Sequence, residues 1–173
     1  MAQTFLNLAQ GVTGTLPNAN FSGGKVLQVV SVEYGTQTGT TSSTYSDTGL
    51  TLNITPSATS SKILCFPSMN GLYNNNGDTN ADFILVRSGG ASGDGDITTL
   101  SSTAMFDADT KAVGGETVSC TYLDTPSVSS ALTYKVQFRS SNNSHQVLIN
   151  TYIRGNARAK CNLTLMEIGA WPI

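Results

Sequence analysis

Apolar and polar residues alternate along much of this chain. In the stretch 131–139, Leu132, Tyr134, Val136 and Phe138 fall on one side of an extended strand, and mostly polar residues fall on the other. Alternation with a period of two is typical of a β-strand that has one buried face and one solvated face. No stretch of comparable length has the 3.6-residue period of an amphipathic helix. The pattern therefore predicts an all-β protein.

The same alternation returns along the chain and predicts a series of short strands. Between them lie turn segments rich in Gly, Asn, Ser and Pro, such as 55–61, 88–95, 125–130 and 140–145. Short strands separated in this way indicate a single antiparallel β-sandwich or jelly roll. We expect strands over about 25–34, 42–47, 49–55, 62–69, 81–88, 96–106, 116–124, 131–139, 146–154 and 160–168.

The first 24 residues differ from the remainder of the chain. Gly or Pro recurs every few residues, no period is sustained, and Pro17 favours an extended conformation at Leu16. We predict that 1–24 form an extended anchoring arm and that 25–173 form the β-sandwich domain. Such an arm cannot bury its own apolar residues, so we expect them to dock on the body or on a partner. The anchoring residues are expected to be Leu8, Val12, Leu16, Pro17 and Phe21.

Three predicted strands are apolar on both faces, namely 25–33, 63–67 and 82–86. A strand that is buried on both sides needs a second cover. The arm or a neighbouring subunit would provide that cover, and we therefore expect a homo-oligomer. The alternative is that loops of the same chain cover these strands.

The charge content is low. Charged residues make up 12% of the chain, about half of the ~25% of a typical globular domain, and the formal net charge is -2. No basic stripe is available for phosphate groups, so nucleic acid is not an expected partner. No run of 18 or more apolar residues predicts a membrane-spanning helix. The N-terminus also lacks the basic start, apolar core and cleavage site of a secretory signal.

Few residues are suited to catalysis. The single histidine, His145, lies in a loop of Ser and Asn, and a Ser-His-Asp triad would have to use it. Cys65, Cys120 and Cys161 are far apart and match neither a disulfide framework nor zinc-ligand spacing. We interpret them as small buried residues of a protein made in a reducing cytoplasm. We predict no enzyme activity, no catalytic residue, no metal site and no cofactor.

The exposed loops provide the candidate binding residues. Gly93-Asp-Gly-Asp96 resembles part of a calcium loop, but the closing Glu and further ligands are missing, so solvated turn aspartates are the preferred interpretation. Paired aspartates also leave open a polysaccharide depolymerase, although no aromatic-rich cleft accompanies them. Tyr and Asn at loop tips are a common recognition surface, for example for a glycan, with ordinary turn packing as the alternative. The candidate residues are Tyr73, Asn75, Asp94, Asp96, Asn143 and His145.

A succession of short motifs resembles a known family. Gln10-Gly-Val-Thr-Gly-Thr-Leu-Pro-Asn-Ala-Asn20 is similar to a connector of bacteriophage tail-fibre proteins. Gly24-Lys-Val-Leu-Gln-Val-Val30, the stretch 49–64, Tyr122-Leu-Asp-Thr-Pro126, Thr133-Tyr-Lys-Val-Gln137 and Leu163-Thr-Leu-Met-Glu-Ile-Gly169 follow in order. Together they resemble the C-terminal, knob-like domains of phage fibre and other virion surface proteins, over nearly the whole chain.

This resemblance implies a non-enzymatic virion surface protein, usually trimeric, with a β-sandwich knob. Because the connector begins only a few residues after Met1, we expect a short fibre, a head fibre or a capsid decoration protein rather than a full tail fibre. Its partners would be its own copies and other capsid or tail proteins, and it would be displayed on the virion surface after assembly in the host cytoplasm. The alternative is a tail-fibre module that binds a host receptor or glycan.

Overall fold

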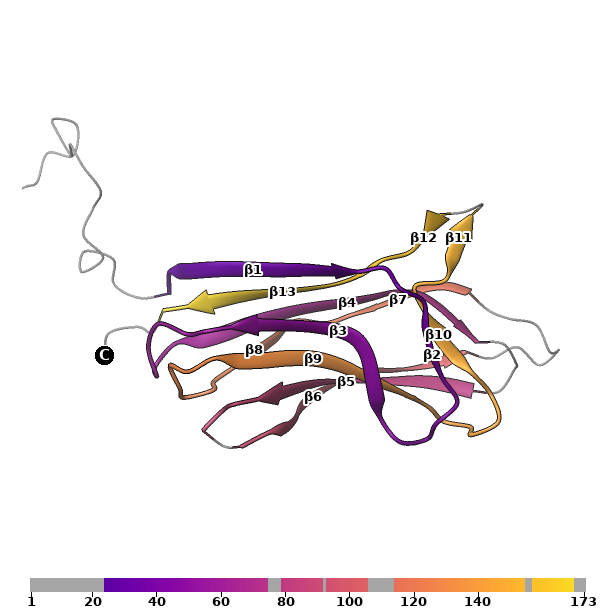
Figure 1. The fold of residues 1–173 in the computed structure, drawn as a ribbon, viewed down its shortest axis with the longest axis horizontal. Helices are drawn as coiled ribbons and strands as arrows, with labels where there is room; N and C mark the ends of the chain where they lie inside the picture. Colours follow the sequence, from indigo (N-terminus) through magenta and orange to yellow (C-terminus); the bar gives the residue numbers. More distant parts are fainter. Residues whose placement is uncertain (1–23, 75–78, 92, 106–113, 155–156, 170–173) are drawn as a thin grey trace, which may run out of the picture.

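Two antiparallel β-sheets pack face to face (Figure 1). The computed structural model describes residues 24–74, 79–91, 93–105, 114–154 and 157–169. The larger sheet, here called sheet A, has the strand order β1-β13-β4-β10-β2, and β7 and β8 also pair with β4. The smaller sheet, sheet B, has the order β3-β9-β5-β6, and β11 and β12 form a separate pair. The predicted antiparallel β-sandwich is therefore confirmed.

The strand bounds follow the chain in a simple order. In sheet A, the strands are β1 (Val26–Tyr34), β2 (Thr38–Thr40), β4 (Lys62–Asn74), β7 (Gly114–Ser119), β8 (Tyr122–Asp124), β10 (Val147–Ile149) and β13 (Cys161–Ile168). In sheet B, they are β3 (Ser46–Ile54), β5 (Thr79–Ser88), β6 (Gly95–Met105) and β9 (Leu132–Ser140). The separate pair consists of β11 (Tyr152–Arg154) and β12 (Ala157–Arg158).

The core lies between the two sheets and follows the predicted alternation. Leu132, Tyr134, Val136 and Phe138 of β9 are all buried, as their spacing predicts. The ring of Phe138 stacks on that of Phe83 in β5, with 6.1 Å between the ring centroids. Stacked aromatic pairs of this kind add to the stabilisation that burial of apolar area provides. Sheet A contributes Ile63, Cys65, Met69, Leu72, Val147, Ile149, Cys161, Leu163 and Leu165 to the same core.

The predicted strands 42–47 and 49–55 are wrong as separate elements. The structure has one strand, β3, whose ladder with β9 skips from Asp47 to Thr51 at a bulge. Gly49 makes this bulge possible, because its φ of +94° favours a residue without a Cβ. Residues 42–45 precede the strand as a loop, in which the Thr44 amide donates to Ser42 Oγ rather than to a ladder partner.

Two other predicted strands are each divided in the structure. The predicted strand 116–124 becomes β7 and β8, which pair with different parts of β4. The predicted strand 146–154 ends as β10 at Ile149, because Asn150 adopts a φ of +56° and turns the chain. The Asn150 side chain stabilises this turn by donating to the Thr36 carbonyl and accepting from the Cys161 amide.

Gly71 allows β4 to extend past the predicted end at residue 69. Its φ is +61°, and a Cβ at this position would lie 2.6 Å from Ala159 Cβ and 3.0 Å from the Thr151 amide nitrogen. We expect Gly71→Ala to lower the free energy of unfolding by roughly 2–4 kcal/mol, from left-handed strain plus overpacking. Gly93→Ala is the control, because Gly93 also has a positive φ but has no atom within 4 Å of the added Cβ. Urea unfolding should show the larger loss at Gly71, and equal losses would contradict the packing argument.

The two ends of the sandwich differ in what they carry (Figure 1). At one end, here called the arm end, the Gly24 amide donates to the Gly169 carbonyl and the Gly169 amide donates to the Lys25 carbonyl. The connections 55–61, 89–94 and 125–131 lie at this end, and the Ala91 amide joins two of them by donating to the Pro126 carbonyl. The connections 41–45 and 141–146 lie at the opposite, far end.

Candidate functional site

The structure does not bring the predicted binding residues together. Tyr73, near the end of β4, and the loop residues Asn143 and His145 lie at the far end. Asp94 and Asp96 lie at the arm end, around the turn from β5 to β6. Asn75 is outside the described residues, as are Leu8, Val12, Leu16, Pro17 and Phe21 of the arm. A single recognition surface formed by all three predicted loops is therefore not what this fold presents.

The far-end loop 141–146 is held by hydrogen bonds within itself and to a neighbouring loop. Asn143 Oδ1 accepts from the Ser43 amide at 2.9 Å, and Ser140 Oγ donates to the His145 carbonyl at 2.7 Å. The ring of His145 is half-buried, and its Nδ1 lies 3.5 Å from Asn142 Nδ2. An amide next to the imidazole supplies no nucleophile, so these contacts favour loop packing over a catalytic triad.

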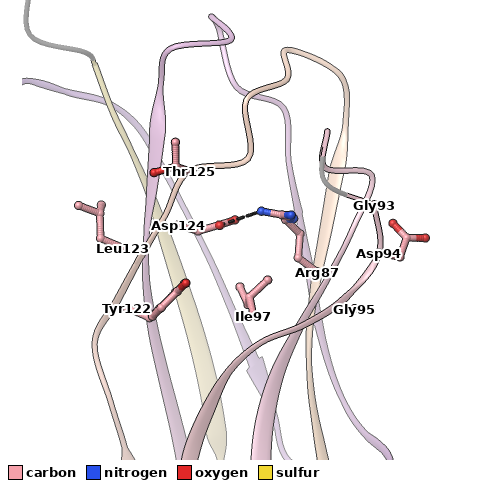
Figure 2. A pocket seen from close by; sticks show the side chains of 9 residues that line it. All are labelled: Arg87, Gly93, Asp94, Gly95, Ile97, Tyr122, Leu123, Asp124 and Thr125. Atoms are coloured by element: carbon pink, nitrogen blue, oxygen red, sulfur yellow. Dashed lines mark hydrogen bonds and ion pairs between the residues drawn. The ribbon is translucent and has the colours of Figure 1, made fainter.

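A pocket of about 390 Å³ opens at the arm end, between the turn from β5 to β6 and strand β8 (Figure 2). Asp94 lies on its rim, where Oδ1 accepts from the Gly89 amide at 2.6 Å and so closes the turn. The lining residues are Arg87, Gly93, Asp94, Gly95, Ile97, Tyr122, Leu123, Asp124 and Thr125.

A buried charge network forms the base of this pocket. Arg87 Nη1 donates to both carboxylate oxygens of Asp124, at 2.7 and 2.8 Å, and the Tyr134 hydroxyl donates to Asp124 Oδ2 at 2.6 Å. Burial, and then the hydrogen bond to Asp124, raise the pKa of Tyr134, so its hydroxyl remains a donor. Since Arg87 and Tyr134 belong to sheet B and Asp124 to sheet A, the network joins the two sheets.

The charges at the base of the pocket already neutralise each other. The side chains of Arg87 and Asp124 are only 7% and 6% exposed, so little of either charge faces the pocket. Gly90 lies over the guanidinium so closely that a Cβ there would be 2.5 Å from Arg87 Cζ. Among the described residues, Arg87 Nε is the buried side-chain atom that lacks a hydrogen-bond partner. The arrangement favours a role in holding the sheets together over acid–base chemistry.

A second buried carboxylate lies at the same end. Glu167 of β13 accepts from the Ser57 amide, the Ser57 and Ser61 hydroxyls and Gln28 Nε2, at 2.6–2.7 Å. Burial alone would raise the pKa of Glu167, but the hydrogen bonds from Ser57, Ser61 and Gln28 outweigh it and hold that pKa below its ordinary value. Glu167 therefore fixes the connection between β3 and β4 to the end of sheet A.

The cysteines are not arranged as a reactive group. Cys65 and Cys161 are fully buried and Cys120 is half-buried, and all three are free thiols. Burial raises the pKa of Cys161 to about 11 and raises the pKa of Cys65 and Cys120 as well, so the thiols stay protonated at neutral pH. Within the described part of the chain, no three His, Cys, Asp or Glu side chains come together as a metal-binding group.

The outer face of sheet A, away from the core, is apolar near the arm end. Val29 of β1 lies opposite Met166 of β13, Met166 lies opposite Leu64 of β4, and Leu64 lies opposite Leu123 of β8. Val29 is 52% exposed and Leu123 is 47% exposed. We define the apolar outer face as these four residues together with Val26, Leu27, Phe66 and Ile168.

This face accounts for two of the three strands predicted to be apolar on both sides. The predicted strands 25–33 and 63–67 correspond to β1 and β4, and both contribute to the apolar outer face. The third, 82–86 in β5, is different, because Ile84 and Val86 are 3% and 8% exposed within the single chain. The strands β6 and β9 flank β5 on both sides. The expectation that β5 needs a cover from another molecule is therefore wrong.

Comparisons with known proteins give one distant likeness. No protein-family model and no curated protein matches the chain. A chain in a solved structure described as "Structure of infectious bursal disease virus Gx strain" is similar at 12% identity and a TM-score of 0.29. The match covers 83% of this chain and 38% of the viral chain, so this chain spans less than half the length of that protein. A likeness at this level carries no argument about function.

Helices that could cross a membrane are absent from the described residues. The secondary structure there consists of strands, and no helix has the length and apolar character that a membrane span requires.

Proposed function

We propose that this chain is a non-enzymatic structural protein of the bacteriophage particle surface, assembled as a homo-oligomer, as a trimer in the form we favour. The observation that carries the proposal is the apolar outer face of sheet A. A protein that acts alone in water rarely leaves Val26, Leu27, Val29 and Leu123 this exposed on one face. The order of motifs that resembles phage virion proteins supplies the particle as the setting.

The chemistry of the described residues supports a structural role. The buried charges pair with each other or with hydroxyl and amide groups, and the thiols are protonated at neutral pH. A surface with few charges and many Ser, Thr and Asn side chains is suited to display on a particle. In the proposed arrangement, residues 1–24 attach the sandwich to the neighbouring virion protein.

Deletion of residues 2–22 tests the attachment. The arm carries large apolar side chains, and burying one such side chain contributes about 1.5–3 kcal/mol. We expect the truncated chain to keep the circular dichroism spectrum of a β-protein but to be lost from particles purified from cells that express it during phage infection. Immunoblotting of the particles measures incorporation, with the full-length chain as control. Normal incorporation of the truncated chain would rule out attachment through the arm.

A glycan-binding module is the second candidate, and the far end favours it. Tyr73 and Asn143 belong to segments that lie side by side there, since β4 pairs with β10 at Tyr73 and Leu148, directly after the 141–146 loop. Binding to a glycan array that is lost in Tyr73→Ala, with particle incorporation intact, would support this function in addition to the structural one.

A further inference from the structure

We infer that the apolar outer face of sheet A, together with the free edge of β1, is the contact surface between copies of this chain. This inference rests on the homo-oligomer of the proposed function and identifies the surface that would hold the oligomer together. Three features carry it: an apolar row that crosses four strands, the open edge of β1, and the neutral chemistry that the chain itself can supply as a cover.

The apolar row is continuous across the sheet. Val29, Met166, Leu64 and Leu123 occupy successive register positions in β1, β13, β4 and β8. Each alternates along its own strand with a buried residue of the core, so the row faces outward while its neighbours face inward. A solvated outer face normally carries polar residues at such positions. The two ends of the row are the most exposed, so a cover must span the whole width of the four strands.

The edge of β1 is open in the described structure. β1 pairs with β13 on one side, and the path of sheet A ends there. Its nine residues contain one charged side chain, Glu33, and neither Lys nor Pro, the residues that commonly block pairing at an edge. The bulge between Val26 and Gln28 is the protective feature that this edge has. Backbone groups along the rest of the edge can pair with an extended segment of another molecule.

A second copy of this chain has the right chemistry for this surface. The face is neutral, and the charged pair at its margin, Lys160 and Glu33, is already joined at 2.8 Å. Residues 1–23 contain no Asp, Glu, Lys or Arg, and they enter the body at Gly24, beside the corner of the face. Each copy therefore has one neutral apolar face and one neutral apolar segment to offer to a neighbour. Contacts of this head-to-tail type close into rings.

Light scattering of the full-length chain, coupled to size exclusion, tests the inference. We expect the wild type to have a multiple of the 18.1 kDa chain mass. Placing charges at both ends of the row, in V29D/L123D, should raise the concentration needed for assembly by at least about a hundredfold and yield a monomer. The control is T51D/T99D, which adds the same charge to exposed positions of sheet B and should stay assembled. Far-UV circular dichroism and thermal melting should show that both variants fold.

Several results would overturn the inference. An oligomer that survives V29D/L123D, or that T51D/T99D disrupts equally, would place the contact elsewhere. A monomeric wild type whose residues 1–23 resist protease, and lose that resistance in V29D/L123D, would mean that the chain covers its own face. A monomeric wild type with a protease-sensitive segment would assign the face to a different protein. An oligomer that is absent from phage particles would refute the proposed function and leave the contact surface standing.

Discussion

Replacing Asp124 with alanine is expected to lower the free energy of unfolding by about 3–5 kcal/mol, as breaking a buried ion pair does. The change leaves the Arg87 guanidinium buried without its carboxylate and removes the acceptor of the Tyr134 hydroxyl. A domain of this size is stable by about 5–15 kcal/mol, so the loss is a large fraction of the total. Chemical denaturation followed by intrinsic fluorescence measures it.

An exposed ion pair provides the control. Asp47 pairs with Lys135 at 2.8 Å, but the Asp47 side chain is 58% exposed, so Asp47→Ala should cost at most about 1 kcal/mol. A second variant separates charge from packing. Arg87→Met combined with Asp124→Leu removes both charges and keeps apolar volume, and it should recover a large part of the stability lost in Asp124→Ala. If Asp124→Ala and Asp47→Ala cost the same, the network does not hold the two sheets together.

Replacing Glu167 with glutamine is expected to cost about 2–4 kcal/mol at pH 7. Four donors converge on the carboxylate, and an amide presents an NH2 group to some of them. Hydrogen bonds to a charged group contribute about 1.5–3 kcal/mol each when they are intact, and an unsatisfied buried donor is costly. The loss is largest where the carboxylate is ionised.

The pH dependence follows from the lowered pKa of Glu167. The folded pKa lies below the unfolded value of about 4.3, so the ionised carboxylate stabilises the fold fully above that pH. Its contribution is lost as the pH falls through the folded pKa. The difference in stability between wild type and Glu167→Gln should therefore be constant from pH 8 to about 5 and shrink below about 4.

Neighbouring serines provide a matched control for this dependence. Ser61→Ala removes a donor to Glu167, raises the pKa of that carboxyl group and moves the acid limb of the stability curve to higher pH. Ser60→Ala changes an exposed residue beside it and should leave the curve unchanged. An acid limb that is identical in all three variants would show that other carboxylates govern acid unfolding.

The sheets and most of the core could be predicted from the alternation of residue types. The strand 131–139 and the inward set Cys161, Leu163 and Leu165 are buried as their spacing indicates. The same spacing contained a signal that we did not use. Glu167 and Arg87 continue the inward sets of β13 and β5, which places a charge inside the sandwich. Their partners, Ser57 and Asp124, come from distant parts of the chain, and alternation along one strand says nothing about which strands meet.

The division of 116–124 and 146–154 has a different cause. Both stretches have the residue types of strands, so a local pattern cannot show where the chain leaves one partner for the next. The left-handed turn at Asn150 depends on hydrogen bonds to Thr36 and Cys161, which only the folded chain brings close.

The apolar outer face shows how far a local pattern extends to surfaces. Apolar residues on both sides of β1 and β4 indicated two strands in need of a cover, and the structure places both in sheet A. The pattern could not separate them from β5, because the burial of Ile84 depends on its position between β6 and β9. The row that ends at Leu123 was not predicted, since it exists only through pairing across four strands.

The pairing of β1 with β13 also sets the timing of folding. β1 begins at Val26, and its partner β13 spans Cys161–Ile168, so the ribosome synthesises the first strand of sheet A long before the strand that completes it. Closing so long a loop carries a large entropic cost and slows folding. During this delay β1 has no ladder partner, and its valines are open to nascent chains nearby on the same messenger RNA. The nascent chain at this stage is a substrate for chaperones and a starting point for aggregation.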